Sequence, residues 1–571
     1  WAYEKGQLYL LQARPVTSYI PLFPELVTKP GEHKMIYVDI MGLTQGFSNT
    51  MSIMGMDFWA RMLTIIKGGF MISSLDGTSP AIHGRQYLNV SNFYKGGGEK
   101  LTFRILNGLD GNLTHIFGNL DLEDYTQGPV PKAVKGMKGG FVKMGLKAIP
   151  AVIKGSISDY NVVLKSFLNG VEKFMHSSDT LSVDGDIIEN VDRIITGSGS
   201  IMNDIGVIYL GAIASSKFKK MFKDDDVEAD ITSLSMDLKG NVTSEMGYLM
   251  FRMAAYSEIK ETVSKDEFMS KIENNLYSAD FMSDYKYFMK RFGSRGFMEI
   301  DVATPRTWED PSSVFDRLKD ISTDKNLSEG VKKKRKDAYD RLLTLAQEKG
   351  IEKKFIKTAE QLQGTFGYRE YPKYVLVYAF GNLHNLLLEY GEKLVKTGQL
   401  ENTYQIFDLH VEEVADALKD SSIDLQARRE ANLAPVKKAA NVKDWPLVID
   451  SRGKVFKPKI VSEDGDLVGA PIASGKVIGR AKVLHSPYEK SLNPGEILVT
   501  KATEPSWTPI FINAAGVVME IGGPLQHGGV IAREYGIPCV SGLIGAMEII
   551  KDGDLLEVDG TNGIVKILEK A

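Results

Sequence analysis

The middle of the chain repeats apolar residues at intervals of three and four, the spacing of an amphipathic helix. Four such stretches contain no proline, and we expect each to be one helix: 186–196, 202–222, 243–256 and 265–292. A fifth helix is predicted over 374–397, because Pro372 suits its first turn and Gly398 its end. Thr243 is expected to cap the helix over 243–256. The section 20–444 is therefore predicted to be mainly helical.

Alternation of apolar and polar residues predicts strands elsewhere in the chain. Residues 1–11 are expected to form a hairpin that turns at Lys5-Gly6, and short strands are expected at 34–40 and 84–90. Near the C-terminus the expected strands are 472–484, 496–499 and 516–519, then a closing hairpin over 555–558 and 563–568. These patterns predict a multi-domain α+β protein with a mainly α-helical central domain, which includes short strands, and a C-terminal α/β domain.

A chain of 571 residues is long enough for several domains. Its 69 basic and 73 acidic residues give a net charge of −4, so we expect no nucleic-acid partner. No apolar run approaches the ~20 residues of a membrane helix, and no membrane partner is expected. The single cysteine, Cys539, excludes an internal disulfide and a multi-cysteine metal site. It lies in an apolar run and is expected to be buried, and this cysteine count fits a reducing, cytoplasmic location.

Methionine and aromatic side chains are concentrated in 46–64, next to Gln45. Methionine fills irregular space and adapts to bulky ligands. The candidate substrate-binding residues of this region are Gln45, Met51, Met54 and Phe58. The alternative is a plain core stripe, which apolar periodicity usually indicates.

A polar cluster over 293–311 interrupts the helices. Glu299 and Asp301 alternate there with apolar residues, which would point both carboxylates to one side of an extended segment. Carboxylates close together raise one pKa and can act as a general base. Arg306 is a candidate substrate-binding residue in the same cluster. The alternative is a structural ion pair between Glu299 and Arg306.

A second polar cluster, 368–373, precedes the helix predicted over 374–397. Arg369 and Lys373 can converge near the start of that helix, where two cations could clamp a phosphate. The alternative is a pair of solvated basic residues at a helix end.

The segment 520–538 combines a glycine-rich turn, one histidine and a short helix closed by Gly536. His527 falls at the N-terminus of that helix, where free N–H groups favour an anion. A neutral imidazole held there could take a phosphoryl group, and its side chain is expected to face solvent. The alternative is a surface histidine beside a loop.

The stretch 522–542 resembles the signature of the swivelling phosphohistidine domain of phosphoenolpyruvate synthases, pyruvate phosphate dikinases and rifampicin phosphotransferases. The similarity extends over about residues 469–568 and includes 474–481 and 503–509. It implies that His527 carries a phosphoryl group. The residues that the resemblance assigns to the phosphohistidine loop are Gly522, Gly523, Gly528 and Arg533.

The chain departs from the family pattern at two places. Dikinases have Thr and Ser just before the histidine, whereas this chain has Leu525 and Gln526, so regulation through a hydroxyl is not expected. The cluster 293–311 also resembles a family pattern, but Ser294 replaces its usual His. The second cluster, 368–373, matches the family's Arg-Glu-x-Pro-Lys motif, which implies that Arg369 and Lys373 line the substrate end of the central domain.

The opening hairpin resembles the closing segment of the ATP-grasp domain in the same family. The resemblance implies that Gln12 helps to hold Mg²⁺, that Arg14 approaches the nucleotide phosphates, and that ATP and Mg²⁺ are the cofactors. On spacing alone, Arg14 would be an edge-strand arginine facing solvent. Most of the nucleotide-binding domain would lie outside this chain, which alone is not expected to bind ATP well.

The expected domains follow from these motifs. They are an ATP-grasp remnant over 1–19, a mainly helical substrate-binding domain over 20–444, a linker over 445–466, and a swivelling phosphohistidine domain over 467–571.

This order of parts resembles that of rifampicin phosphotransferases and of prodiginine-forming ligases. The resemblance implies ATP-dependent phosphoryl transfer through His527 to an oxygen of a small, largely apolar organic acceptor, with AMP and phosphate as the other products. The expected catalytic residues are His527, Arg369, Lys373, Glu299 and Asp301. Two alternatives stay open: a ligase that activates an oxygen as phosphate before condensation, and a non-catalytic binding or regulatory fragment. The sequence does not specify the oligomeric state.

Overall fold

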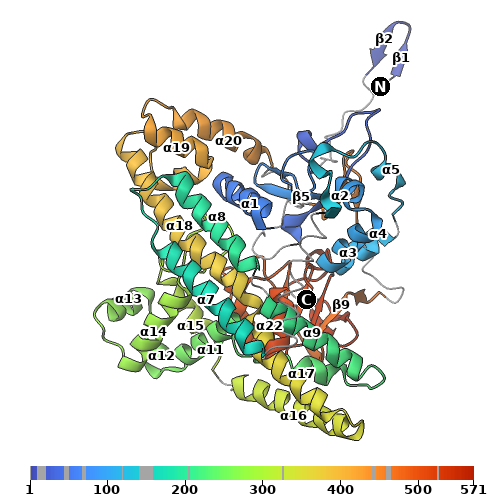
Figure 1. The fold of residues 1–571 in the computed structure, drawn as a ribbon, viewed down its shortest axis with the longest axis vertical. Helices are drawn as coiled ribbons and strands as arrows, with labels where there is room; N and C mark the ends of the chain where they lie inside the picture. Colours follow the sequence, from blue (N-terminus) through green and yellow to red (C-terminus); the bar gives the residue numbers. More distant parts are fainter. Residues whose placement is uncertain are drawn as a thin grey trace.

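The computed structural model describes residues 2–9, 21–43, 50–66, 72–118, 120–139, 159–203, 206–323, 327–439, 442, 445–457, 465–523 and 526–571. Figure 1 shows a large helical body, a smaller sheet with short helices around it, and a C-terminal α/β domain between them. This arrangement confirms the predicted multi-domain α+β fold class. Gln12, Arg14 and Gln45 lie outside the described residues.

Three long helices run side by side through the helical body (Figure 1). They are α7 (Tyr160–Asp179), α8 (Ile187–Asn203) and α18 (Tyr371–Lys396). Their apolar stripes meet in one core, in which Phe167 and Phe380 are buried. The helix predicted over 374–397 is confirmed, with Pro372 in its first turn and Gly398 at a φ of +77° just past its end.

Further helices extend this body in two groups. The first group packs around Phe218 and Phe355. Its helices are α9 (Gly206–Met221), α10 (Glu228–Ser233), α16 (Leu327–Glu348) and α17 (Glu352–Thr365). The second group packs around Phe268 and Phe281. Its helices are α11 (Val242–Ala255), α12 (Ser257–Glu261), α13 (Lys265–Glu273), α14 (Ala279–Phe292) and α15 (Ser313–Asp320). Beyond α18 the chain adds α19 (Val411–Lys419) and α20 (Leu425–Ala439).

The smaller sheet has the strand order β4-β5-β3-β6-β7, with every pair antiparallel. Its strands are β3 (Ile36–Asp39), β4 (Ala81–Ile82), β5 (Arg85–Asn89), β6 (Val448–Asp450) and β7 (Val455–Phe456). The helices beside it are α1 (Ile53–Ile66), α2 (Val90–Gly97), α3 (Glu99–Leu109), α4 (Gly111–Gly118) and α5 (Glu123–Thr126). Residues 448–456 therefore belong to this sheet and not to the linker expected over 445–466, because the apolar β6 pairs along β3.

The C-terminal domain is an eight-stranded sheet in the order β8-β15-β14-β10-β11-β12-β13-β9. Its strands are β8 (Leu467–Val468), β9 (Ala470–Ala473), β10 (Lys476–Val483), β11 (Ile497–Thr500), β12 (Gly516–Met519), β13 (Cys539–Ser541), β14 (Leu555–Asp559) and β15 (Ile564–Glu569). The helices are α21 (Thr508–Asn513), α22 (His527–Tyr535) and α23 (Ala546–Ile549). The four strands from β10 to β13 are parallel, which confirms the α/β character of this domain. Cys539 is buried on β13, as expected.

Three predicted elements are corrected. The helix expected over 265–292 is two helices, because Asn275 takes a positive φ of 51° and Ser278 caps α14. The cap of α11 is Asn241 and not Thr243, since the Asn241 side chain accepts hydrogen bonds from the first backbone N–H groups of the helix. The strand expected over 472–484 is split into β9 and β10 at Gly475, which has a φ of +125°.

The predicted N-terminal hairpin is confirmed: β1 (Ala2–Glu4) and β2 (Gln7–Tyr9) pair antiparallel around Lys5-Gly6. It stands apart from the rest of the molecule in Figure 1. Through the described parts of the chain, no helix combines the length and the apolar character that a membrane span needs.

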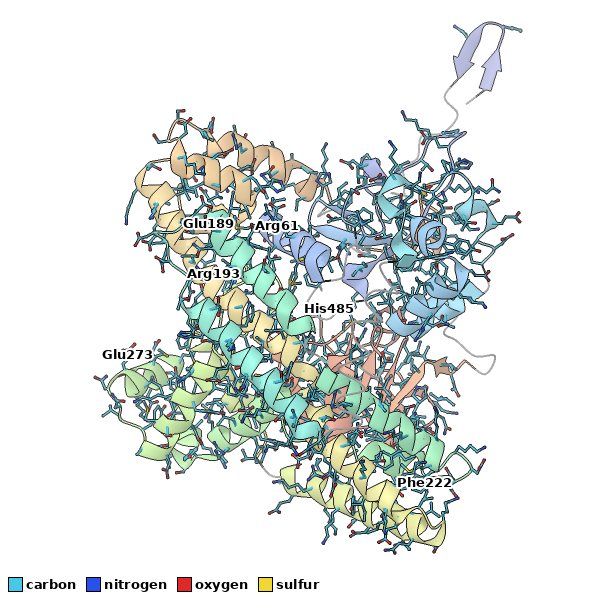
Figure 2. The ribbon with its side chains drawn as sticks, viewed as in Figure 1. Arg61, Glu189, Arg193, Phe222, Glu273 and His485 are labelled. Carbon is cyan, nitrogen blue, oxygen red and sulfur yellow. The ribbon has the colours of Figure 1, made fainter. Side chains whose placement is uncertain are left out.

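Ionic contacts join the smaller sheet's helices to the helical body. Arg61 on α1 pairs with Glu412 on α19, and its Nη1 lies 3.8 Å from Asp192 Oδ1 on α8. Figure 2 shows Arg61 at this junction, beside Glu189 in the first turn of α8. The two halves of the central section are therefore held together by charge as well as by apolar packing.

Gly536 ends α22 in the left-handed region, at a φ of +66° and a ψ of 34°. An L-residue pays about 1–2 kcal/mol in that conformation, so Gly536→Ala should lower the midpoint of urea denaturation. Gly330→Ala is the matched control, because Gly330 lies exposed inside α16 with nothing near its Cβ position. That change should raise the midpoint slightly. Equal effects of the two substitutions would contradict the assigned cap.

Candidate active site

The first residue of α22 is His527, whose side chain is enclosed, with 1% of its surface exposed. Its Nδ1 lies 3.2 Å from Thr503 Oγ1, and its Nε2 lies 3.2 Å from Thr508 Oγ1. Phe511 meets the ring edge to face, at 6.0 Å between centroids. The expectation that His527 faces solvent is wrong, because the C-terminal domain packs α22 against α11 and α16 of the central domain.

The surroundings of His527 favour the neutral form of its ring. Burial, and then the positive charges of Lys373 and Arg295, lower its pKa well below the usual value. Both cations belong to the central domain, so the ring lies where the two domains meet. A neutral imidazole keeps a nitrogen lone pair, which is what attack on phosphorus requires.

Two glycines of the predicted loop are needed for close packing. A Cβ on Gly528 would lie 2.4 Å from Met519 Sδ, and one on Gly522 would lie 2.7 Å from Ser541 Oγ. Both distances are far below normal contact, so a larger residue at either position would require the side chain of Met519 or Ser541 to move. The start of α22 is therefore pressed against the ends of these two strands.

Gln526 connects this loop to the segment that follows β3 of the smaller sheet. Its Oε1 accepts a hydrogen bond from Gly523 N at 3.1 Å, and its Nε2 donates to Leu43 O at 2.9 Å. Farther along α22, Arg533 Nη1 donates to Ile472 O at 3.4 Å, inside the C-terminal domain. Gln526 thus makes a structural contact at the position where dikinases have a hydroxyl residue.

Glu299 is fully buried next to two cations. Its Oε1 accepts a hydrogen bond from Arg295 Nη1 at 2.8 Å and lies 3.2 Å from Lys373 Nζ. Burial alone would raise the pKa of Glu299, but Arg295 and Lys373 outweigh it and hold the pKa below its usual value. Glu299 is therefore a carboxylate that stays charged and positions Lys373.

The segment around Glu299 turns and is not extended as predicted, because Met298 takes a positive φ of 55°. Asp301 has different partners from Glu299. It accepts hydrogen bonds from Ser52 N at 2.6 Å and Ser52 Oγ at 2.7 Å, and Ser52 directly precedes α1. Buried Arg306 donates to the backbone carbonyls of Glu299 at 2.8 Å and Asp301 at 2.9 Å. The expected Glu299–Arg306 side-chain pair is thus replaced by a guanidinium that holds the turn.

Arg369 and Lys373 have different partners. Lys373 faces Glu299, whereas Arg369 Nη2 donates to Glu534 Oε1 at 3.0 Å. Glu534 lies on α22 and also accepts hydrogen bonds from Asn241 Nδ2 at 3.0 Å and from Asp237 N. We call these contacts of Glu534 the docking latch. The expectation that the two basic residues converge on one phosphate is corrected, because the latch engages Arg369.

Glu504 is a site residue that the sequence reasoning did not select. It follows Thr503 and has 3% of its surface exposed. Its Oε1 accepts a hydrogen bond from Met298 N of the central domain at 2.8 Å. Burial raises its pKa to about 7, against the opposing effect of Lys373. The signal available in the sequence was its place inside the family motif 503–509.

The methionine-rich segment lies inside the core. Met51, Met54 and Phe58 are all buried, and the Phe58 ring lies 6.5 Å from that of Phe380. The packing matches the alternative of a core stripe, and contact of these residues with an acceptor stays a prediction.

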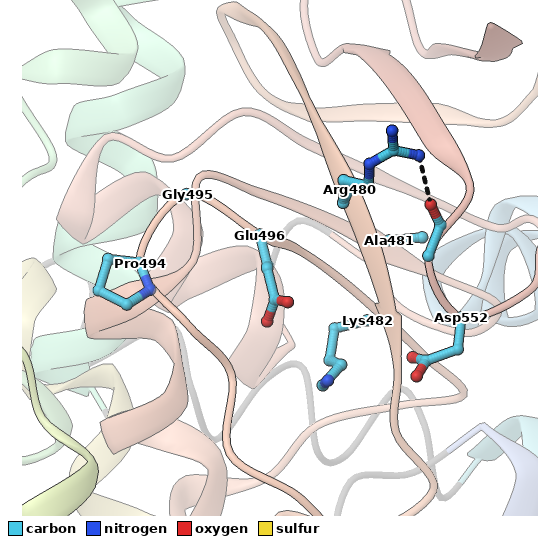
Figure 3. Close-up of a pocket in the computed structure, with 8 residues that line it drawn as sticks. Arg480, Ala481, Lys482, Pro494, Gly495, Glu496 and Asp552 are labelled. Atoms are coloured by element: carbon cyan, nitrogen blue, oxygen red, sulfur yellow. Dashed lines mark hydrogen bonds between the residues drawn. The ribbon is translucent and has the colours of Figure 1, made fainter. Parts of the chain in front are cut away.

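Two hollows lie on or beside the C-terminal domain. A cavity of about 50 Å³ lies between the domains, lined by apolar side chains of α11 and α14 and by Arg295, Gly296, Pro505 and Ser506. A larger hollow of about 440 Å³ is shown in Figure 3, where Arg480 Nη1 donates to Gly553 O at 3.0 Å. It lies at the start of β11, whereas Thr503 and Glu504 follow the end of that strand. The smaller cavity is therefore the one next to the site.

Among the residues that the structure describes, no three His, Cys, Asp or Glu side chains gather as a metal site would require. Mg²⁺, with Gln12 as its expected ligand, stays a prediction.

Comparison with known proteins bears on this site. Residues 202–370 match the model of the rifampicin phosphotransferase fourth domain, and residues 492–563 match the mobile domain of PEP-utilising enzymes. The chain is 26% identical to the rifampicin phosphotransferase of Streptomyces sviceus and 27% identical to that of Bacillus cereus. Both alignments cover 100% of this chain, which spans 65% and 66% of the length of these relatives. The rifampicin phosphotransferase of Bacillus subtilis is 31% identical over 59% of this chain and 41% of its own length. These matches confirm the resemblance predicted from the sequence.

The latch yields a test of docking. Glu534→Gln removes the charge that faces Arg369, and breaking a buried ion pair costs about 3–5 kcal/mol. Part of that cost falls on the contact between the domains, so His527 should react faster with diethyl pyrocarbonate. Glu569→Gln, an exposed carboxylate of the same domain, is the control and should leave the reactivity unchanged. Unchanged His527 reactivity in Glu534→Gln would show that the latch does not hold the domains together.

Proposed function

Because this chain is related to rifampicin phosphotransferases and carries the mobile domain of PEP-utilising enzymes, we propose that it transfers a phosphoryl group through His527 to an organic acceptor. The observation that carries the proposal is the enclosed, neutral His527 ring at the contact between the two domains, under the influence of Lys373 and Arg295. Such a ring can accept a phosphoryl group, and the cations beside it can stabilise that group during transfer.

The roles of the site residues follow from their contacts. Lys373 offsets the negative charge of the transferring phosphoryl group, and Glu299 holds Lys373 in place at 3.2 Å. The N–H groups at the start of α22 favour the phosphate that His527 carries. Arg369 contributes through the latch, which brings His527 to the central domain. The enclosed position keeps water from the phosphorus, so transfer to the acceptor is favoured over hydrolysis.

The donor in this proposal is ATP with Mg²⁺, which leaves AMP and phosphate, and Gln12 and Arg14 are its proposed contacts. The acceptor is a small, largely apolar organic molecule that presents an oxygen. Rifampicin, for which the relatives are named, is the first acceptor to test. Mass spectrometry of the product distinguishes a phosphoester from the condensed product that a ligase would release.

Replacement of His527 tests the phosphoryl carrier. In the complete enzyme, incubation with ATP and Mg²⁺ should place an acid-labile phosphate on His527, and His527→Ala should abolish both this phosphate and turnover. His485→Ala, an exposed histidine of the same domain, should retain both. Mass spectrometry of the intact protein at alkaline pH gives the readout. Turnover that survives in His527→Ala would refute the carrier.

Replacement of Lys373 tests the acceptor side of the site. Lys373→Met should slow the loss of phosphoryl from loaded His527 to rifampicin by ~10²-fold, because one stabilising donor is removed. Loading of His527 from ATP should stay nearly normal. Lys396→Met, on the exposed end of the same helix, is the control. Single-turnover chase experiments separate the two half-reactions, and equal slowing of both in Lys373→Met would place this lysine outside the transfer step.

A further inference from the structure

Glu504 has an unusual position at the domain contact. Its neighbour in the chain, Thr503, contacts His527 Nδ1, while Glu504 itself reaches across to Met298 N of the central domain at 2.8 Å. Its Oε1 also accepts a hydrogen bond from Ser506 Oγ at 3.2 Å. Its Oε2 is buried, and within the described ranges it has no hydrogen-bond partner. A buried carboxylate oxygen without a donor is costly, so this atom is ready to accept a proton or a hydrogen bond.

The other two carboxylates of the site are less suited to accept a proton. Glu299 is matched by Arg295 at 2.8 Å and Lys373 at 3.2 Å, which stabilise its charged form. Asp301 accepts hydrogen bonds from Ser52 N, Ser52 Oγ and Ala303 N. Glu299 Oε2 is also buried without a hydrogen-bond partner among the described residues, so what separates Glu299 from Glu504 is the pair of cations that holds its charge. Asp301 is separated from Glu504 by its three hydrogen-bond donors.

We propose that Glu504 is the general base that takes the proton from the acceptor hydroxyl when phosphoryl leaves His527. This assignment rests on the proposed function. It places the base on the mobile domain, one residue from a direct contact of the histidine, so the base and the phosphoryl group reach the acceptor together.

The step balances as follows. The hydroxyl oxygen of the acceptor attacks phosphorus, and its proton passes to Glu504 Oε2. The bond between phosphorus and the His527 ring nitrogen breaks, and its electron pair returns to that nitrogen. With a proton on the second ring nitrogen of the phosphorylated histidine, His527 leaves as neutral imidazole. The products are the phosphoester, neutral His527 and protonated Glu504, which releases its proton when the domains separate.

The electrostatic surroundings agree with this role. Burial raises the pKa of Glu504 to about 7, with Lys373 lowering it and Glu299 raising it. The charge of Glu504 also raises the pKa of Tyr488, whose ring packs under Arg317 of the central domain. A base whose pKa lies near neutral pH is effective in proton transfer. The carboxylate form is required, so transfer should slow as the pH falls below 7.

Space for a hydroxyl group lies beside the segment that follows Glu504, although neither Glu504 nor His527 lines it. The cavity of about 50 Å³ is lined by Pro505 and Ser506, the two residues that follow Glu504, and by Arg295 and Gly296 of the central domain. This volume exceeds the ~10–15 Å³ that a water-sized group needs. A small alcohol can therefore serve as a probe.

The test uses the complete enzyme loaded with phosphoryl from ATP and then chased with methanol in buffer. Glu504→Gln retains the oxygen that accepts from Met298 N, so it keeps the docking contact. It should load normally but form methyl phosphate ~10²-fold more slowly than the unchanged enzyme. In the unchanged enzyme, the rate of methyl phosphate formation should fall as the pH drops below about 7, and in the variant this fall should be absent. Glu548→Gln, an exposed carboxylate of the same domain, should behave as the unchanged enzyme.

The outcomes are distinguishable. Failure of the unchanged enzyme to form phosphohistidine would refute the proposed function and this assignment with it. Normal loading, together with equal chase rates and equal pH profiles in the unchanged enzyme and Glu504→Gln, would refute the base alone. Slower loading and slower chase to the same degree in Glu504→Gln would also overturn the assignment, because a base for the acceptor acts in the second half-reaction only.

Discussion

The cost of burying charge at a contact between two domains governs this structure. Glu534, Glu299 and Glu504 are all enclosed there, and a buried carboxylate is tolerated only when a cation, several donors or a proton compensates it. Arg369 compensates Glu534, and Arg295 with Lys373 compensates Glu299. Burial raises the pKa of Glu534 despite Arg369, and it raises the pKa of Glu504, which has no ion pair among the described residues, to about 7. Of these contacts, the ion pair of Glu534 with Arg369 and the hydrogen bond from Met298 N to Glu504 join the two domains, whereas Glu299 and its two cations all belong to the central domain.

Docking and chemistry are thereby coupled in one set of contacts. The same α22 that carries His527 at its start carries Glu534 near its end, so the latch fixes the position of the ring along the helix. A swivelling domain has to break the latch to leave and to form it again on return. Contacts that are worth several kcal/mol but involve few residues suit a reversible motion, because each can be replaced by water when the domains part. In the proposed function, arrival of the domain assembles the site, and the enclosed His527 is then shielded from water.

Much of the fold could be predicted from local patterns, whereas the site contacts could not. Periodicity and end signals predicted α18 and α22, and alternation predicted β3, β5 and the closing hairpin, because these depend on near neighbours. The family motif identified His527. The latch joins residues 165 positions apart, and no local signal indicates that Arg369 meets Glu534. The alternation of polar and apolar residues around Glu299 predicted an extended segment, but the chain turns at Met298. The positive φ of Met298 accompanies tertiary contacts such as the hydrogen bond from Met298 N to Glu504, which no local pattern indicates.

The central claim is that the docked arrangement is the one that transfers phosphoryl to the acceptor. A disulfide lock tests it directly. Ser491 Oγ of the C-terminal domain lies 2.7 Å from Asp320 Oδ1 at the end of α15, both exposed, and the natural Cys539 is buried. Cysteines at positions 491 and 320 would be oxidised after His527 has been loaded, and the rate of transfer to the acceptor would then be measured. We expect the locked enzyme to complete one transfer at the normal rate and to resist reloading from ATP. Loss of that single transfer, with reloading intact, would contradict the account.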